Sequence, residues 1–120
     1  MNNKRQSVTA LSTMWAIQDR FKNNMSLFVE VARELGYTAI EINHSMTKSD
    51  IEQLQKSALL PVLGVHGPAP LKIHGGRGEN RGLNLASLDP EERALTVSDH
   101  IDSIELAADT GANHVVVHLG

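Results

Sequence analysis

Residues 89–120 read DPEERALTVSDHIDSIELAADTGANHVVVHLG, and this stretch decides the fold class. Asp89 is a suitable N-cap and Gly111 is a stop signal, so the stretch predicts a helix over 89–111. A short apolar run follows at 114–120, which is typical of a strand that is covered on both faces. A helix that leads directly into such a strand is one repeat of an α/β fold.

The helix predicted over 89–111 carries one apolar stripe. Its members follow one another at spacings of three and four residues: Ala94, Val97, Ile101, Ile104 and Ala108. This period is that of an amphipathic helix, so we expect the stripe to face the core.

The same alternation of strand and helix runs through the rest of the chain. The patterns predict strands at 8–15, 38–43 and 61–67 and helices at 23–36 and 47–58. Strands that alternate with helices form a parallel sheet with right-handed crossovers. The predicted class is therefore α/β, in one domain that covers residues 1–120.

The composition excludes several classes of function. The 120 residues are 41% hydrophobic and 21% charged, which is ordinary for a globular protein. The net charge of −3 argues against a general nucleic-acid or membrane surface. The absence of cysteine excludes disulfides and thiolate metal sites, and no apolar stretch has the length of a membrane span. The cytoplasm is the expected location.

Two architectures fit the predicted order of elements, an open doubly wound sheet and half of a (β/α)8 TIM barrel. A complete barrel needs at least about 200 residues, so this chain holds only half of one. The open nucleotide-binding sheet is disfavoured, because no Gly-x-Gly-x-x-Gly lies between the first strand and the first helix. We therefore expect the N-terminal half of a TIM barrel, with four parallel strands and three helices. Its two open sheet edges would favour self-association.

Two histidines lie at the carboxyl ends of predicted strands, where the active sites of parallel α/β proteins gather. His66 closes the third strand and His118 the fourth. Neighbouring strands are about 4.8 Å apart, so the two imidazoles can converge on one metal ion. The alternative for each histidine alone is a hydrogen bond to a loop. As a pair on consecutive strands, they are candidate metal ligands.

The segment LKIHGGRGENRGLNLAS (71–87) is long for a link between a strand and a helix, and loops of this length are often lids or binding loops. Its His74, Arg77 and Arg81 are candidate substrate-binding residues. Arginines flanked by glycine suit a phosphate, because guanidinium groups bind it bidentately and glycine lets backbone amides approach. The alternative is a flexible loop in solvent.

GVHGPAP (64–70) followed by LASLDPEERALTVSDHIDSIELAADTGANHVVVHLG (85–120) resembles the xylose-isomerase-like TIM barrel superfamily. This group contains sugar-phosphate isomerases and epimerases together with endonuclease IV. The similarity covers nearly the whole chain, with LGYTAIEIN (35–43) as the second strand. In the endonuclease IV branch, histidines at the positions of His66 and His118 are metal ligands. In many isomerases and epimerases of the group, these early histidines line the substrate pocket instead.

The resemblance also assigns roles on the second strand. Glu41 and Asn43 match a Glu-rich strand whose end faces the substrate pocket in this superfamily. A carboxylate there could bind a sugar hydroxyl or orient a histidine, or it could be satisfied by loop amides. We expect the remaining histidines, His44, His100 and His114, to be structural.

The resemblance implies a metal-dependent sugar or sugar-phosphate isomerase or epimerase, of which this chain would be a truncated N-terminal portion. A divalent ion (Zn, Mn, Mg or Co) would polarise the substrate oxygens, and later strands would supply the general bases. The runner-up is an endonuclease IV-like phosphodiesterase acting on abasic DNA, which the histidine pair supports and the acidic balance opposes. The third possibility is a non-catalytic half barrel that self-associates.

Overall fold

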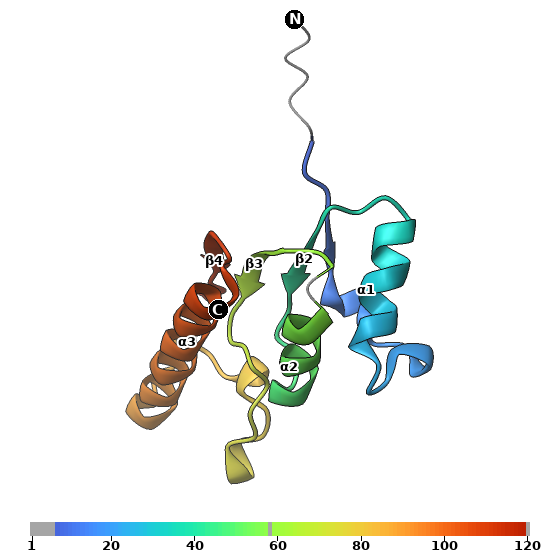
Figure 1. Ribbon diagram of the computed structural model, residues 1–120. Helices are drawn as coiled ribbons and strands as arrows, with labels where there is room; N and C mark the ends of the chain where they lie inside the picture. Colours follow the sequence, from blue (N-terminus) through green and yellow to red (C-terminus); the bar gives the residue numbers. More distant parts are fainter. Residues whose placement is uncertain (1–6, 58, 120) are drawn as a thin grey trace, which may run out of the picture.

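The structure is a computed structural model that describes residues 7–57 and 59–119. Strands and helices alternate along these residues in the predicted order (Figure 1). The strands are β1 (Ala10–Ser12), β2 (Ala39–Ile42), β3 (Val62–His66) and β4 (His114–Val116). The helices are α1 (Met25–Glu34), α2 (Lys48–Ser57) and α3 (Pro90–Thr110). Short 3-10 turns follow β1 and interrupt the loop between β3 and α3.

The four strands form one parallel sheet in the order β1-β2-β3-β4. The register places Ser12, Glu41, Gly64 and His114 side by side in one row across the sheet. The pairing of β2 with β3 shifts by one residue between Ile40 and Glu41. The predicted α/β class and parallel sheet are thus confirmed.

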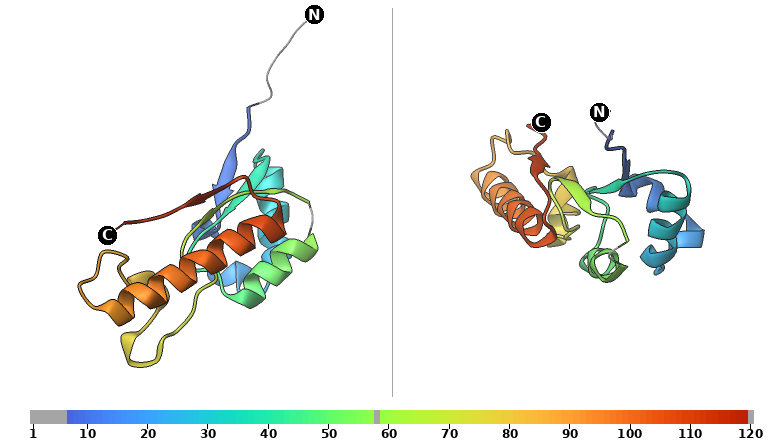
Figure 2. Two further views of the ribbon diagram at one scale, coloured as in Figure 1. Left: turned by 90° about the vertical axis from the view of Figure 1, so that its left-hand side faces the viewer. Right: turned by 45° about the horizontal axis from the view of Figure 1, so that its top comes forward.

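All three helices lie on one side of the sheet, with the core between them and the strands (Figure 2). From the strands, Ile40, Ile42 and Val65 enter this core and are fully buried. The helices contribute further buried side chains, among them Met25, Phe28, Val29, Ile51 and Leu54. A doubly wound sheet carries helices on both faces. The described chain covers one face only, an arrangement compatible with half of a barrel.

The helix ends follow the signals in the sequence. At the start of α2, the Asp50 N–H donates to Thr47 Oγ1 and the Thr47 N–H donates to Asp50 Oδ2, each at 3.1 Å. This reciprocal pair satisfies two backbone donors that the helix leaves unpaired. At the start of α3, Asp89 Oδ1 accepts from the Glu91 N–H at 3.0 Å. Gly111 ends α3 in the left-handed conformation at φ +79°, where a side chain would be strained.

The prediction that the apolar stripe of α3 faces the core is wrong. Val97, Ile101 and Ile104 are 49%, 50% and 57% exposed, respectively. The buried side of α3 consists mainly of polar residues instead: Thr96, Asp99, His100, Ser103 and Ala107. The physical reason is that this side meets the polar loop before α3. There the Ala69 N–H donates to Ser103 Oγ at 2.8 Å.

The strand ends also differ from the prediction. The first strand stops at Ser12, because Thr13–Ala16 turn into a 3-10 helix. The last strand stops at Val116, and Gly120, its predicted end, lies outside the described residues.

In the described part of the chain, no helix has the length and apolar character that crossing a membrane requires.

Candidate functional site

The uncovered face of the sheet carries polar side chains, and strand alternation places them there. Glu41 lies between Ile40 and Ile42, which are both buried under the helices, so it points to the opposite face. His66 follows Val65, which is also buried in the core. The same alternation puts His114 on the uncovered face, since its neighbour Val115 packs against the core.

The Glu41 carboxylate contacts two imidazoles from the two strands beyond it. His66 Nε2 lies 3.3 Å from Oε2, and His114 Nε2 lies 3.0 Å from Oε1. In this geometry each imidazole donates an Nε2–H to a different carboxylate oxygen, so the carboxylate orients both rings. All three side chains remain partly exposed. The contacts join β2, β3 and β4 in one polar cluster.

Gly64 makes the contact between Glu41 and His114 possible. It lies between these two residues in the row across the sheet. A Cβ added at Gly64 would lie 2.6 Å from His114 Cε1, closer than any non-bonded contact allows. The His114 ring therefore lies over the glycine and reaches a carboxylate two strands away.

His118 extends the cluster beyond the end of β4. Its ring centroid lies 6.2 Å from that of His66, with 35° between the ring planes. The expected pair of strand-end histidines is therefore on one side of the sheet. Two imidazoles on one tetrahedral ion, at Zn–N distances of about 2.0–2.1 Å, have centroids roughly 5 Å apart. The observed separation is about 1 Å wider than that arrangement requires.

The described residues do not form a complete binding site for the metal ion that the resemblance implies. Among residues 7–57 and 59–119, no three His, Cys, Asp or Glu side chains are arranged to hold an ion. The Glu41 carboxylate is shared between two imidazoles, and His66 and His118 alone are two ligands. A closed metal site would need further ligands.

Arg81 and His44 lie beside the cluster, at the turn after β2. Arg81 Nη1 donates to Ser45 Oγ at 2.6 Å, which brings this residue of the loop before α3 to the end of β2. Its Nε donates to Glu79 Oε2 at 2.5 Å. The neighbouring His44 has a lowered pKa, because burial and the positive charges of Arg81, His118 and His66 disfavour its protonated form. Its Nδ1 is buried and has no partner among the described residues.

Asn43 is buried and engaged with the end of β1. The Thr13 hydroxyl donates to Asn43 Oδ1 at 2.8 Å, and the Asn43 N–H donates to Thr13 Oγ1 at 2.8 Å. The Asn43 amide nitrogen contacts the sulfur of Met14. The side chain therefore ties β1 to β2, and it is not brought together with Glu41 and the imidazoles.

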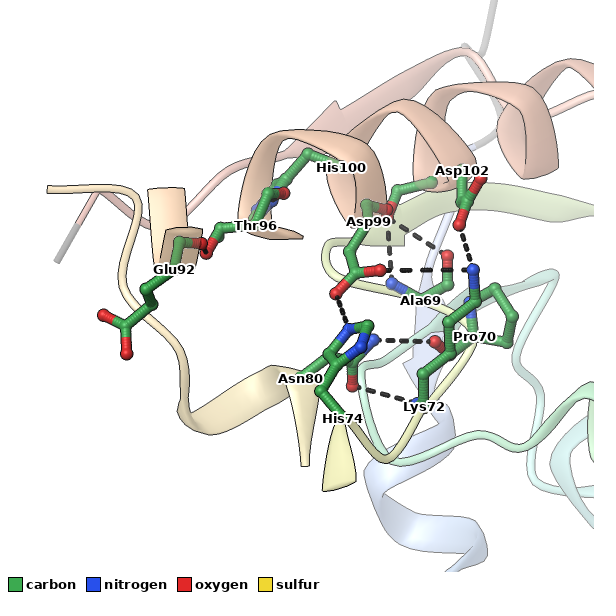
Figure 3. A network of polar contacts seen from close by, with 11 residues as sticks. Ala69, Pro70, Lys72, His74, Asn80, Glu92, Thr96, Asp99, His100 and Asp102 are labelled. Atoms are coloured by element: carbon green, nitrogen blue, oxygen red, sulfur yellow. Dashed lines mark hydrogen bonds and ion pairs between the residues drawn. The ribbon is translucent and has the colours of Figure 1, made fainter. Parts of the chain in front are cut away.

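A buried carboxylate ties the loop before α3 to that helix (Figure 3). Asp99 Oδ2 lies 2.7 Å from His74 Nε2, and its Oδ1 lies 4.0 Å from Lys72 Nζ. The lysine also pairs with Asp102 on the next turn of α3. His74 thus makes its contact with α3 on the helix side of the loop. In the described chain it has no polar contact with Glu41 or His66.

Arg77 is also engaged by α3. Its Nη1 donates to Asp89 at 2.7 Å and its Nη2 to Glu91 at 2.9 Å. The hydrogen bond from Arg77 is the main reason why the pKa of Asp89 is lowered, and the same pair raises the pKa of Arg77. Of the three loop residues predicted to bind substrate, only Arg81 reaches the carboxyl end of the sheet.

The sequence analysis missed two residues of the site. His114 was expected to be structural at the base of the fourth strand, yet it contacts Glu41 at 3.0 Å. The signal that could have found it is the glycine at position 64, which leaves room above the middle strand. His44 was expected to be structural, and in the structure burial and the charges of Arg81, His118 and His66 lower its pKa. His100 lies in α3 as expected, where its Nδ1 donates to the Thr96 carbonyl at 2.7 Å.

Comparison with known proteins gives no family assignment. The chain matches no protein-family model and no curated protein at a significant level.

Proposed function

We propose that the uncovered sheet face binds a sugar or sugar phosphate, and that the chain is the N-terminal half of a metal-dependent isomerase or epimerase of the TIM barrel type. The observation that carries this proposal is a carboxylate on an open sheet face, held by imidazoles from two neighbouring strands. Carboxylates accept hydrogen bonds from vicinal hydroxyls, and imidazoles both donate and accept them. The resemblance to sugar isomerases supports the same substrate class.

In this proposal the chain binds and orients the substrate. Glu41 accepts hydrogen bonds from sugar hydroxyls, and His66 and His118 line the substrate or supply two of the ligands to a divalent ion. Such an ion would polarise the substrate oxygens. The Glu41 carboxylate is already shared between two imidazoles. The proposal therefore assigns the transfer of the proton between substrate carbons to strands other than these four.

The test is calorimetric binding of fructose, a ketose, to the full chain and to Glu41→Gln. Loss of the charged acceptor should weaken binding by about tenfold, because a hydrogen bond to a charged group contributes roughly 1.5–3 kcal/mol. Glu30→Gln is the matched control, since Glu30 is exposed on α1, which covers the other face. Equal affinity of wild type and Glu41→Gln would refute the assignment of the sugar to this face.

A second candidate, a half barrel that self-associates as a structural unit, is favoured by the exposed stripe of α3. Val97, Ile101 and Ile104 lie on the surface of the helix next to β4. Strands β1 and β4 each have one partner in the described sheet, so each leaves one edge unpaired. A second copy of the chain would cover the apolar stripe of α3 and pair with the open edges of the sheet. Mass measurement in solution separates a defined dimer from a monomer.

A further inference from the structure

We infer that a cleft between the loop that joins β1 to α1 and the start of α2 binds a free α-amino acid with an apolar side chain. The cleft has a volume of about 340 Å³, at the lower end of the roughly 300–1,000 Å³ that is typical of small-molecule sites. Neither Glu41 nor the two imidazoles that it contacts line this cleft. The inference therefore goes beyond the proposed function and does not depend on it.

Apolar side chains form the bottom and one wall of the cleft. Ala16, Met25 and Met46 belong to the buried core and close the bottom. Ile17 lines the wall and is 55% exposed, so its side chain is open to a ligand. Methionine is unbranched and polarisable, which lets this surface adapt to side chains of different shape. An apolar group of a ligand would leave water here.

The wall that carries Ile17 is held in place by contacts within its own loop. Gln18 Nε2 donates to the Trp15 carbonyl at 2.7 Å, and Arg20 Nε donates to Gln18 Oε1 at 3.1 Å. Trp15 packs on Phe21 with the ring centroids 5.5 Å apart. A wall that is ordered before binding loses little conformational entropy when the ligand arrives.

The polar side chains of the opposite wall are already engaged within the protein. Thr47 Oγ1 donates to Asp50 Oδ2 at 2.8 Å, in the cap of α2. Ser45 Oγ accepts from Arg81 at 2.6 Å. These groups shape the cleft, and the polar recognition of a ligand falls to the other wall.

The polar groups that are free to bind a ligand lie on the single turn 19–23. The Asp19 carboxylate, the Lys22 ammonium and the Asn23 amide all line the cleft. Within the described residues, none of these three side chains makes a hydrogen bond or an ion pair. Asp19 and Lys22 are three residues apart in the sequence, yet they do not pair with each other. The turn therefore presents one anionic and one cationic group to the same cleft.

One carboxylate and one ammonium beside an apolar surface match an α-amino acid group by group. Lys22 would pair with the ligand carboxylate and Asp19 with the ligand ammonium, while the apolar side chain would lie against Ile17 and the bottom of the cleft. A simple carboxylic acid would leave Asp19 unpaired and repelled, and a simple amine would do the same to Lys22. Charge complementarity thus selects the zwitterion.

The experiment is isothermal titration calorimetry of the full chain with L-leucine and three analogues that each lack one of its groups. Leucinamide lacks the carboxylate, isocaproate lacks the ammonium, and glycine lacks the apolar side chain. We expect leucine to bind more tightly than each analogue. Binding of isocaproate or leucinamide as tight as that of leucine would overturn the assignment of an amino acid, and so would the absence of leucine binding.

Two charge substitutions locate the site. Lys22→Gln should weaken leucine binding by about fivefold and leave leucinamide binding unchanged, because this analogue has no carboxylate to pair. Asp19→Asn should weaken leucine binding by a similar factor and leave isocaproate binding unchanged. Lys56→Gln is the matched control, since Lys56 lies in the last turn of α2 and does not line the cleft. An equal loss in Lys56→Gln and Lys22→Gln would overturn the inference.

Ile17→Ser tests the apolar wall, and circular dichroism shows that each variant folds. Because Ile17 is largely exposed, the substitution should leave the fold intact, weaken leucine binding and spare glycine binding. Unchanged leucine binding in Ile17→Ser, Lys22→Gln and Asp19→Asn would overturn the inference.

Glu41→Gln separates this inference from the proposed function. It should bind leucine as wild type does, because Glu41 lies on the other face of the sheet. Loss of leucine binding in Glu41→Gln would contradict the cleft as its site. Fructose binding to wild type that persists without any leucine binding would refute the cleft alone and leave the sugar proposal standing.

Discussion

Gly64 allows the Glu41 carboxylate to contact a histidine two strands away. It stands between Glu41 and His114 in one row of three parallel strands. Because it has no side chain, the carboxylate and the imidazole meet above it at 3.0 Å. One missing Cβ thereby converts two separate polar residues into a joined cluster. The cluster then includes His66 through the second carboxylate oxygen.

Gly64→Ala should break the contact between Glu41 and His114 without unfolding the protein. The new Cβ occupies the place of the His114 ring, and this ring, whose side chain is 41% exposed, can rotate into solvent. We expect the free energy of unfolding to stay within about 1 kcal/mol of wild type, because loss of glycine flexibility offsets part of the cost of crowding. Urea denaturation measures this change.

The control for Gly64→Ala is the double variant with His114→Ala. With the ring already absent, the added methyl group loses its three nearest contacts, which are all atoms of that ring, so the two substitutions should be non-additive. Additive effects on the free energy of unfolding would show that His114 does not lie over Gly64.

At the scale of single residues, the sequence predicts positions better than partners. Glu41, His66 and His118 were identified from strand ends and from the resemblance, and the structure places all three on the uncovered side of the sheet. Asn43 follows the same strand, but its turn directs the amide to Thr13. His114 was missed because its partner lies two strands away, at a distance of 73 residues along the chain, and only the register reveals the contact.

At the scale of elements, the ends of α3 were predicted correctly, whereas the side of this helix that faces the core was predicted wrongly. The N-cap and the closing glycine depend on local backbone geometry, so the sequence determines them. Which side is buried depends on what the helix meets. The preceding loop presents His74, Lys72 and the Ala69 backbone, and these require polar partners. Apolar spacing alone gives no information about that loop.

The start of α3 should lose stability in acid through Asp89. Its pKa is lowered in the folded protein by the hydrogen bond from Arg77 and by the Glu91 backbone N–H. A lowered folded-state pKa means that the contribution is present above the ordinary value of 3.8 and is lost as the pH falls through the lower, folded-state value. Wild type should therefore lose more stability between about pH 5 and about pH 3 than Arg77→Gln does.

Urea midpoints at the two pH values provide the measurement for Asp89. Glu105→Gln removes an exposed carboxylate of the same helix that has no ion pair within the described residues, so it should behave as wild type does. An acid-induced loss in Arg77→Gln as large as that of wild type would contradict the role of the Arg77–Asp89 pair.

At the scale of the whole molecule, the alternation of elements predicted the parallel sheet and its order, because each βα unit packs against its neighbour in sequence. The uncovered face follows from the position of all three helices on one side, and the two open edges follow from β1 and β4 having one partner each in the described sheet. That position depends on tertiary packing, which the period of apolar residues does not encode. The arrangement leaves the polar side chains of the uncovered sheet face and the apolar stripe of α3 exposed.

Ile104→Glu should keep the chain monomeric if a second copy covers the stripe of α3. A charge at this exposed position cannot be buried against another apolar surface without a large desolvation cost. Leu88→Glu is the control, because Leu88 is 95% exposed in the loop before α3 and lies outside the stripe. Sedimentation velocity gives the mass of each. An unchanged dimer in Ile104→Glu, or a monomeric wild type, would contradict association through this surface.

The central claim is that ligand binding takes place on the uncovered sheet face, and the histidines of the chain test it directly. Long-range proton–nitrogen correlation spectra should resolve the imidazole nitrogens, with and without fructose 6-phosphate. We predict that the signals of His44, His66, His114 and His118 move, while those of His74 and His100, which are held at α3, stay in place. Shifts confined to His74 and His100, or no shift at saturating ligand, would contradict the account.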